Sequence, residues 1–401
     1  MEDWVRYGDE LRRPLCVADD LPNSSTVCVV GGGLSGLSVA YRIASKRPDV
    51  QVELIEKSDR LGGVIETWTQ GEWVCDVAVN ATRAHPAFWR LVDDLGLGDR
   101  FAPSNPEADA RWVYTRGRSQ KLSLWTVLRR GPLKMLNGVR RARQGGRSVA
   151  EAVPLPPVND AMTLGIVNDR SANVDADFLM PSMTRYGAEP PVKWKRIKTK
   201  MNGTYPLFRP EKGATASLEG GMQTLVLALE QALLRLENVS ITLNAGATTP
   251  QSVAEERNLP LSSVVWCAPL DRLPEAFTTL NVYAVGYAEG DVADVPVGYG
   301  TLIPDAASPI SGILHESDVH GSPRAPQGHR LFRIMSPTRQ TGTDDTVRAA
   351  LVNHLGGADP VLFEHIGVRA IPSYLPATWR PCPPIPLSLI HISEPTRLTS
   401  I

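Results

Sequence analysis

The sequence predicts an α/β fold with α+β insertions, and three neighbouring patterns support that prediction. An apolar run at 26–30, rich in β-branched residues, is typical of a strand buried on both faces of a parallel sheet. A glycine-rich turn follows at 31–36 and leads into an amphipathic helical pattern. A second apolar strand at 50–55 ends in Glu56. This strand–turn–helix–strand order indicates a Rossmann-type domain.

The composition is that of an ordinary globular protein. The chain has 401 residues, of which 42% are hydrophobic and 21% are charged, and its net charge is −1. That length accommodates two or three domains of about 100–200 residues each. The nearly balanced charge argues against a dedicated nucleic-acid-binding protein, so we expect no nucleic-acid partner.

Cysteine usage and hydropathy narrow the class further. The five cysteines are scattered and form no C-x-x-C pair, so we expect neither a disulfide framework nor a metal site. No stretch reaches the roughly 18 apolar residues that indicate a membrane-spanning helix. Six acidic residues within positions 1–20 make this end unlike a signal or transit peptide, so no targeting signal is visible.

The glycines of the turn have the G-x-G-x-x-G spacing at Gly31, Gly33 and Gly36. The first glycine permits the tight turn, the second lets the backbone approach a pyrophosphate, and the third lets the helix pack on the strand. The N-terminus of the helix then faces the phosphate charge. Glu56 follows Gly36 by twenty residues, where a carboxylate can accept hydrogen bonds from an adenosine ribose. These features predict a dinucleotide site.

The residues after Glu56 favour FAD over NAD. The segment 56–63 resembles the extension of the second strand in the flavin amine oxidase superfamily, where an arginine and a glycine pair lie against the FAD pyrophosphate and flavin. A polar turn explains the glycine pair alone, but not its spacing from Glu56. The predicted cofactor-binding residues are Gly31, Gly32, Gly33, Leu34, Ser35, Gly36, Glu56, Lys57, Arg60, Gly62, Gly63 and Val64.

A basic segment at 111–147 contains eleven arginines and lysines and no acidic residue. Tryptophan and leucine are interleaved with these charges, and glycines and prolines divide the segment into short predicted helices. Such a composition suits an anionic membrane surface. A solvated helical face within a substrate domain explains it equally well.

Later patterns complete the predicted organisation. Apolar runs at 239–243, 264–267, 298–304 and 331–335 indicate strands, and 224–236 indicates a helix with a leucine face. We predict an N-terminal extension (1–25), a Rossmann-type FAD-binding domain (26–84 and 217–272), a helical membrane-binding or substrate insertion (85–216), a mixed-sheet substrate-binding domain (273–386) and a tail (387–401).

With these elements in order, the chain resembles oxygen-dependent protoporphyrinogen oxidase over residues 26–385. Besides the superfamily motif, four segments carry the resemblance: 165–183 with Gly165-Ile-Val and Phe178-Leu-Met-Pro, 217–225 with Ser-Leu-Glu-Gly-Gly-Met, 298–304 with Gly-Tyr-Gly-Thr-Leu-Ile-Pro, and 371–379 with Ile-Pro-Ser-Tyr. The third of these is distinctive for the family.

The resemblance implies three successive two-electron dehydrogenations of protoporphyrinogen IX, with FAD reoxidised by O₂ to give hydrogen peroxide. The protein then positions and shields the reactants, and no side-chain base is required. The implied substrate-contacting residues are Asn80, Tyr299, Gly300 and Leu302, although ordinary core packing is the alternative for Tyr299 and Leu302. The implied location is the face of the mitochondrial inner membrane if the source is eukaryotic, and a homodimer is compatible with the sequence.

The chain also departs from the family pattern. Ala78-Val-Asn80 stands where the family commonly has G-P-(R/N), and Asn168-Asp169 replaces an Ala-Gly pair. The string at 387–401 resembles the conceptual translation of a transposon-type sequencing adaptor, so we interpret it as non-native and the flavin domain as truncated. The alternatives are therefore another flavin amine oxidase or desaturase, an inactive fragment that binds FAD weakly, and, third, an NAD-dependent dehydrogenase.

Overall fold

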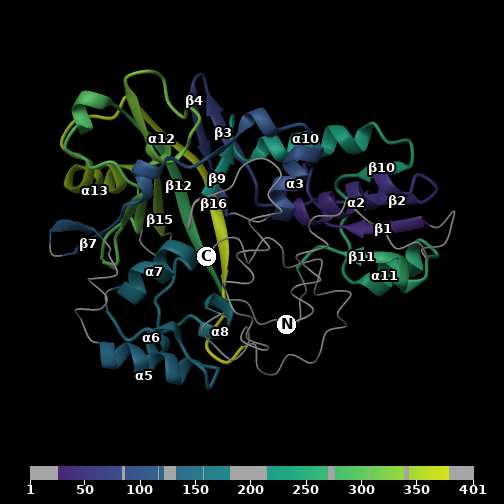
Figure 1. Cartoon of the computed structure of the whole chain (residues 1–401), viewed down its shortest axis with the longest axis horizontal. Helices are drawn as coiled ribbons and strands as arrows, with labels where there is room; N and C mark the ends of the chain where they lie inside the picture. Colours follow the sequence, from purple (N-terminus) through teal and green to yellow (C-terminus); the bar gives the residue numbers. More distant parts are fainter. Residues whose placement is uncertain are drawn as a thin grey trace.

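The computed structural model describes residues 26–83, 86–115, 117–121, 132–156, 158–180, 215–269, 276–305, 307–337 and 343–378. The extension predicted at 1–25 and the tail predicted at 387–401 lie outside these residues, as does most of the basic stretch between 122 and 131. The described part comprises a nucleotide-binding unit, a large second sheet and a group of short helices (Figure 1).

The predicted Rossmann-type unit is confirmed. Its sheet has the order β10-β2-β1-β11, and every pair is parallel. The strands are β1 (Thr26–Val30), β2 (Gln51–Ile55), β10 (Val239–Thr242) and β11 (Val264–Trp266). The helices are α2 (Leu34–Lys46), α10 (Gln223–Leu234) and α11 (Pro250–Glu256).

The alternation of side chains along β1 explains why this strand is apolar throughout. Val27 and Val29 pack into the core beneath α2 and α10, whereas Cys28 and Val30 pack with α11 on the other face. A parallel strand covered on both faces needs apolar residues at every position.

The second sheet is mixed and has the order β16-β12-β15-β14-β13-β7-β8. Its strands are β7 (Arg111–Thr115), β8 (Arg118–Lys121), β12 (Ala276–Ala288), β13 (Gly300–Leu302), β14 (Gly312–Leu314), β15 (His329–Pro337) and β16 (Leu362–Ser373). Neighbours are antiparallel except β13 and β7, which are parallel. The strands predicted at 298–304 and 331–335 are therefore confirmed.

The two faces of this sheet bury different cores. Phe332 and Ile334 of β15 pack against α13 (Asp344–Leu355), whereas Leu331 and Met335 pack on the opposite face. We call this opposite face the inner face, because it packs against Cys75 and Val77 of the segment that follows the glycine-rich turn.

One expectation is wrong at the start of the basic segment. Residues 111–121, predicted within a helical insertion, form the β7–β8 hairpin, and β7 joins β13 of the second sheet. Aromatic and β-branched side chains at 112–115 favour a strand, and a count of basic charges does not register that preference. Helices follow after residue 131, where α5 (Pro132–Ala142), α6 (Val149–Ala152), α7 (Val158–Val167) and α8 (Ala176–Leu179) form a group with its own core around Val149, Leu155 and Leu179 (Figure 1).

The remaining elements are short. The region 85–216 also contains α3 (Pro86–Asp94), and α12 (Glu316–Val319) lies between β14 and β15. A hairpin joins β3 (Thr67–Gln70) to β4 (Trp73–Asp76), and a small sheet joins β5 (Thr82–Arg83), β9 (Thr215–Leu218) and β6 (Phe101–Pro103). Turns of 3₁₀-helix occur at Gly98–Arg100, Pro106–Asp109, Leu261–Ser263 and Glu289–Val292.

Among the described helices, none combines the length and apolarity needed to cross a bilayer.

The nucleotide turn yields the first prediction. A Cβ on Gly36 would lie 1.8 Å from the Gly31 carbonyl oxygen, so α2 cannot keep its contact with β1. We expect Gly36→Ala to lower the free energy of unfolding by at least about 1–3 kcal/mol, as overpacked sites do. Gly290→Ala is the control, because no atom of the described residues lies within 4 Å of its added Cβ. Equal denaturant midpoints for the two variants would contradict this account of the turn.

Candidate nucleotide-binding site

The site begins where β1 ends and α2 starts. Gly31 has a φ of +104°, and its amide donates to the Ile55 carbonyl at 2.8 Å. A Cβ on Gly31 would lie 3.0 Å from the carbonyl oxygen of Cys267. Both the positive φ and the close carbonyl require glycine at this position.

Gly33 differs from its neighbours because it has room. It is the N-cap residue of α2 in an extended conformation, and among the described residues a Cβ on it would meet no atom nearer than Gly63 Cα at 4.0 Å. Tight packing therefore does not explain this glycine. Open space directly at a helix N-terminus does, because a ligand can approach the backbone there.

The second glycine pair closes against the first. The Gly62 amide donates to the Gly32 carbonyl at 2.8 Å, and a Cβ on Gly63 would lie 3.2 Å from Gly33 Cα. Both Gly62 and Gly63 have positive φ, of +104° and +59°. The structure thus brings together two glycine segments, thirty residues apart in sequence, at one end of α2.

Arg60 holds this second segment in place. Its guanidinium donates to the Gly63 carbonyl at 2.8 Å and to the carbonyls of Leu61 and Ile65 at 3.2 Å, and it pairs with Glu66 at 3.4 Å. Its visible role is to shape the glycine pair. Lys57 is exposed beside the turn, and Val64 is 61% exposed next to Gly63.

The first turn of α2 is open to an anion. In the part of the chain that the structure describes, no side chain caps this helix and no acidic residue lies in its first turn. The amides of Leu34, Ser35 and Gly36 occupy that turn, where helix geometry leaves N–H groups without partners within the helix. The positive end of the helix dipole therefore faces the space beside Gly33.

Glu56 is buried and already bound to the backbone. Its Oε2 accepts from the Gly32 amide at 2.6 Å, and its Oε1 accepts from the Ser58 amide at 2.8 Å. Burial raises the pKa of Glu56, but the hydrogen bonds from Ser58 and Gly32 outweigh it, so the pKa lies below its usual value. The carboxylate thus braces the turn, and each oxygen keeps a further lone pair for a ligand.

The predicted substrate contacts come from two separate parts of the fold. Asn80 follows β4, its carbonyl accepts from Ser217 Oγ at 2.9 Å, and its buried Nδ2 has no partner in the described structure. Tyr299 precedes β13, and its ring centroid lies 4.6 Å from Arg111 Cζ. No described contact joins Asn80 directly to Tyr299.

Gly300 and Leu302 lie on the inner face of the second sheet. A Cβ on Gly300 would lie 2.5 Å from the Ile313 carbonyl oxygen, so the close approach of β14 requires this glycine whether or not a substrate does. Leu302 meets α7, where a Cβ on Gly165 would lie 2.7 Å from Leu302 Cδ2.

Sequence reasoning missed a buried network that joins the two units. Asp76, at the end of β4, accepts from Thr67 Oγ1 at 2.6 Å and from the Met222 amide at 2.8 Å. Its other oxygen pairs with Arg324 Nη1 at 3.1 Å, and Arg324 Nη2 donates to Ser217 Oγ at 2.8 Å. Asp76 and Arg324 are 0% and 1% exposed. Asp76 therefore holds the start of α10 and the inner face together.

Arg333 extends this network from β15. Its Nη1 donates to the carbonyls of Asp76 at 2.6 Å and Ala78 at 3.1 Å, and its Nε pairs with Glu316 at 3.2 Å. The other oxygen of Glu316 lies 2.8 Å from His320 Nε2. A sequence signal existed, because arginine within an otherwise apolar strand needs a buried partner.

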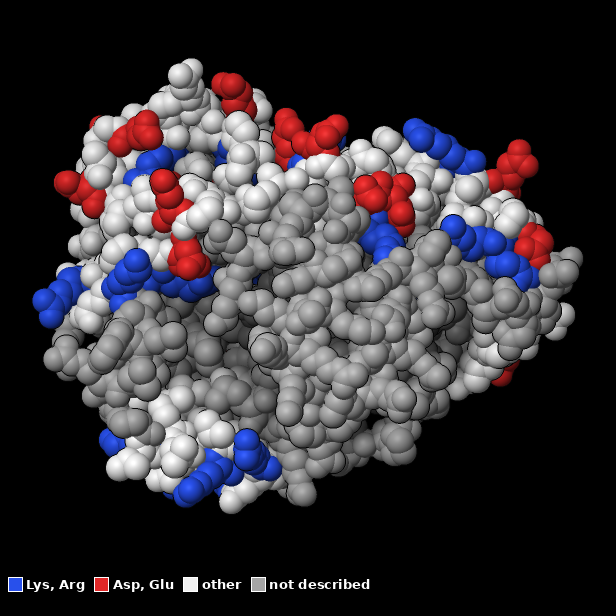
Figure 2. All heavy atoms as spheres, in the orientation of Figure 1, with Lys and Arg blue, Asp and Glu red and all other residues white. Residues whose placement is uncertain are grey.

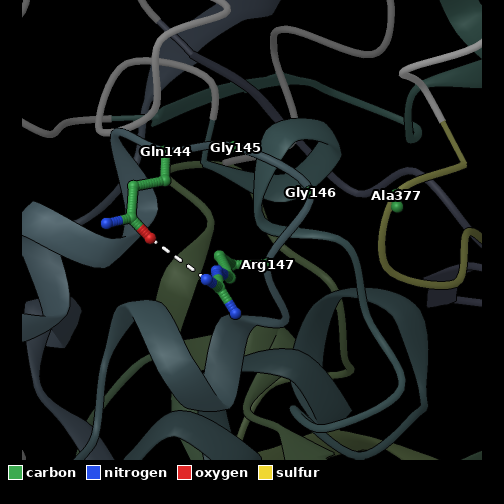
Figure 3. Close-up of a pocket in the computed structure, with 5 residues that line it drawn as sticks. All are labelled: Gln144, Gly145, Gly146, Arg147 and Ala377. Atoms are coloured by element: carbon green, nitrogen blue, oxygen red, sulfur yellow. Dashed lines mark hydrogen bonds between the residues drawn. The ribbon is translucent and has the colours of Figure 1, made fainter.

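A surface pocket of about 290 Å³ lies among the short helices (Figure 3). It is lined by Gln144, Gly145, Gly146, Arg147 and Ala377. Arg147 donates to Gln144 at 3.1 Å and pairs with Glu151 at 3.1 Å, so its charge is already balanced. None of the predicted site residues lines this pocket.

Glu56 yields the second prediction. Glu56→Ala removes the acceptors of two backbone amides, one of them buried, and should cost about 1–3 kcal/mol of stability near pH 7. Because the folded pKa is lowered from 4.5, the carboxylate stabilises the fold above that pH, and this contribution is lost as pH falls through the folded pKa. The stability gap between wild type and Glu56→Gln, measured by denaturant unfolding, should therefore shrink below pH 4.5. A stability difference between the two proteins that does not change with pH would contradict the role of the Glu56 carboxylate in holding the turn.

Comparison with known proteins is consistent with this geometry. Residues 29–95 match the family described as NAD(P)-binding Rossmann-like domain. The chain is 37% identical over 107 residues to coproporphyrinogen III oxidase of Mycobacterium leprae, a match covering 26% of this chain and 23% of that protein. It is 24% identical over 372 residues to protoporphyrinogen oxidase of Schizosaccharomyces pombe, covering 73% of this chain and 75% of that one.

Solved structures share the fold. A protein of Exiguobacterium sp. 255-15, provisionally named protoporphyrinogen oxidase, has a TM-score of 0.59 at 15% identity, with 88% of both chains covered. A putrescine oxidase variant has a TM-score of 0.54 at 15% identity, covering 86% of this chain and 85% of the other. Together with the glycine turn, these likenesses show a Rossmann-like dinucleotide-binding domain within a fold that the solved oxidases share, and the match spans only about a quarter of the M. leprae protein's length.

Proposed function

We propose that the chain binds FAD at the two glycine segments and oxidises a porphyrinogen. The observation that carries the cofactor assignment is the open space beside Gly33, at an uncapped helix N-terminus and opposite Gly63. The first-turn amides would hold the pyrophosphate, and Glu56 would accept from the ribose through its remaining lone pairs. The residues present thus fit the group.

FAD, when bound, supplies the two-electron acceptor chemistry. The protein's part is to hold the substrate and exclude water. Leu302 lies on the inner face in the row of Gly312 and Met335, and the segment that leads to Asn80 packs on that face through Val77. In this proposal a flat, apolar macrocycle packs against Leu302, and Asn80 Nδ2 donates to a polar group on it.

The substrate class rests on the relatives. The S. pombe protein and the M. leprae protein are named for different porphyrinogens, so we propose protoporphyrinogen IX first and coproporphyrinogen III second. O₂ is the proposed acceptor. A flavin amine oxidase remains the rival because the putrescine oxidase fold matches almost equally well. A fold shared at this identity does not select between them.

We also propose that α5 binds an anionic membrane surface. Its inner side packs on α6, where a Cβ on Gly138 would lie 2.3 Å from the Ala152 carbonyl oxygen. Its outer side exposes Leu133 and Leu136, at 76% and 53%. Exposed arginines at 140, 141 and 143 lie beside these leucines, and Figure 2 shows the basic side chains gathered at this edge of the molecule. Exposed leucine beside arginine is typical of an interfacial helix.

The function test uses Gly33→Val. The open space lets the fold accept this side chain, so stability should change by less than about 1 kcal/mol, whereas FAD affinity should fall by about tenfold or more because the pyrophosphate position is filled. FAD fluorescence titration measures binding. Wild type should convert protoporphyrinogen IX to a fluorescent porphyrin in air, and Gly33→Val should not.

Two results would contradict the proposal. Unchanged FAD affinity in Gly33→Val would remove the glycine turn from the site. Flavin-loaded wild type that oxidises putrescine but neither porphyrinogen would favour the amine oxidase. Gly290→Ala serves as the control for both assays, since it fills open space elsewhere.

The membrane proposal predicts salt-sensitive binding to vesicles that contain anionic lipid. Each basic residue near such a surface contributes about 1 kcal/mol, so replacing the arginines at 140, 141 and 143 by glutamine should weaken binding by about a hundredfold. The charge-matched control neutralises exposed Arg42, Lys46 and Arg235 on the nucleotide-binding unit. Equal loss in both triple variants, or binding that ignores salt, would favour a solvated face.

A further inference from the structure

Two arginines of β15 make the same kinds of contact with different parts of the molecule. Arg330 binds both oxygens of Asp318, at 2.6 and 3.2 Å, and donates to two carbonyls, those of Val292 and Val295, at 3.1 and 2.8 Å. Arg333 pairs with Glu316 at 3.2 Å and likewise donates to two carbonyls. The two side chains are 7% and 6% exposed. Since they are three positions apart on a strand, they point to opposite faces of the sheet.

The carbonyl groups that these two arginines bind lie in different units of the fold. Arg330 binds the 3₁₀ turn after β12, which lies within the same sheet unit. Arg333 binds Asp76 and Ala78, which belong to the segment that leads from β4 to Asn80. Only Arg333, of this pair, connects the sheet with the nucleotide-binding side.

The other carbonyl of this segment is held by the same network. The Asn80 carbonyl accepts from Ser217 Oγ, which accepts in turn from Arg324. The carbonyls at positions 76, 78 and 80 are thus all bound through two buried arginines and one serine. A segment bound at three carbonyls has little freedom to shift.

The strand register relates Arg333 to β13, the strand that carries Gly300 and Leu302. Arg333 lies directly across from Leu314 of β14, and Leu314 lies directly across from Gly300 of β13. Two strand spacings of about 4.8 Å place β13 about 10 Å from β15. Arg333 therefore stands on the same row as Gly300 while its guanidinium grips the segment that carries Asn80.

We propose that Arg333 is a positioning residue for the proposed porphyrinogen oxidation. Its role is to set the distance between Asn80 and the residues Gly300 and Leu302 of β13. Asn80 and Leu302 belong to different units of the fold. The hydrogen bonds from Arg333 of β15 to the carbonyls of Asp76 and Ala78 connect those two units directly. Loss of these two bonds would move Asn80 relative to β13, and none of the described contacts of Arg333 is with the glycine turn itself. The proposal rests on the proposed function for its substrate, whereas the contacts of Arg333 with Asp76 and Ala78 are independent of that function.

The test compares Arg333→Met with Arg330→Met as a matched control. Both variants lose a buried ion pair and two bonds to carbonyls, and Arg330→Met also loses a second hydrogen bond to Asp318, so the control should lose at least as much stability as Arg333→Met. Hydrogen exchange at positions 76–80 should accelerate in Arg333→Met only. Its kcat/KM for protoporphyrinogen IX should fall about tenfold to a hundredfold below that of Arg330→Met, because small misplacements of contacting groups have such effects. FAD affinity should be equal in the two.

A double-mutant cycle then separates positioning from general damage. If Arg333 acts through Asn80, the effects of Arg333→Met and Asn80→Ala on kcat/KM should be non-additive, whereas those of Arg330→Met and Asn80→Ala should add. Arg333→Lys keeps the charge near Glu316 and should lie between wild type and Arg333→Met, which provides a milder variant if the methionine variant folds poorly.

The outcomes are distinct. Equal rates of amide hydrogen exchange at positions 76–80 in the two methionine variants would show that Arg333 does not hold this segment. This measurement needs neither cofactor nor substrate. Faster exchange with additive kinetics would overturn the positioning role and leave a structural one. Wild type without FAD binding or turnover would instead contradict the proposed function, and the exchange comparison would still decide whether Arg333 holds the segment.

Discussion

The fold depends on a set of charges buried between its two main units. Asp76, Arg324, Arg333 and Glu316 are each no more than 7% exposed, and each is paired. Removing one partner from such a set leaves an unpaired buried charge, which typically costs about 3–5 kcal/mol, a large share of a domain's net stability. The four residues come from β4, β15, α12 and the segment after α12, so the network closes only when both units are in place.

The pKa shifts show how these charges depend on one another. Burial raises the pKa of Asp76, and Arg324 opposes that effect without cancelling it. Burial also raises the pKa of Glu316, but Arg333 and His320 outweigh burial and bring the pKa below its usual value. The network reaches the dinucleotide turn through α10, because the amide of its N-cap residue Met222 donates to Asp76. Val226 of the same helix would lie 3.1 Å from a Cβ on Gly62.

A different constraint determines the residues of the glycine turn, namely the space that is available for a side chain at each position. Gly31, Gly36 and Gly62 lack side chains because neighbouring backbone or side-chain atoms fill the positions, whereas Gly33 lacks one beside open space. The fold requires the first three, and we propose that the fourth leaves room for the cofactor. This difference gives the cofactor proposal a physical basis that the shared fold alone does not supply, because unrelated activities occur on the same fold.

The sequence by itself determined the Rossmann-type unit, the strands of β13 and β15, and the helix of α10, because local periodicity and glycine spacing carry those features. It did not determine that residues 111–121 form strands, since their role depends on pairing with β13, nearly two hundred positions away. The network around Asp76 was likewise decided by tertiary structure, because Asp76 and Arg324 are 248 positions apart. A sequence shows which side chains are charged, but only the packed fold shows which charges are removed from water together and must be paired.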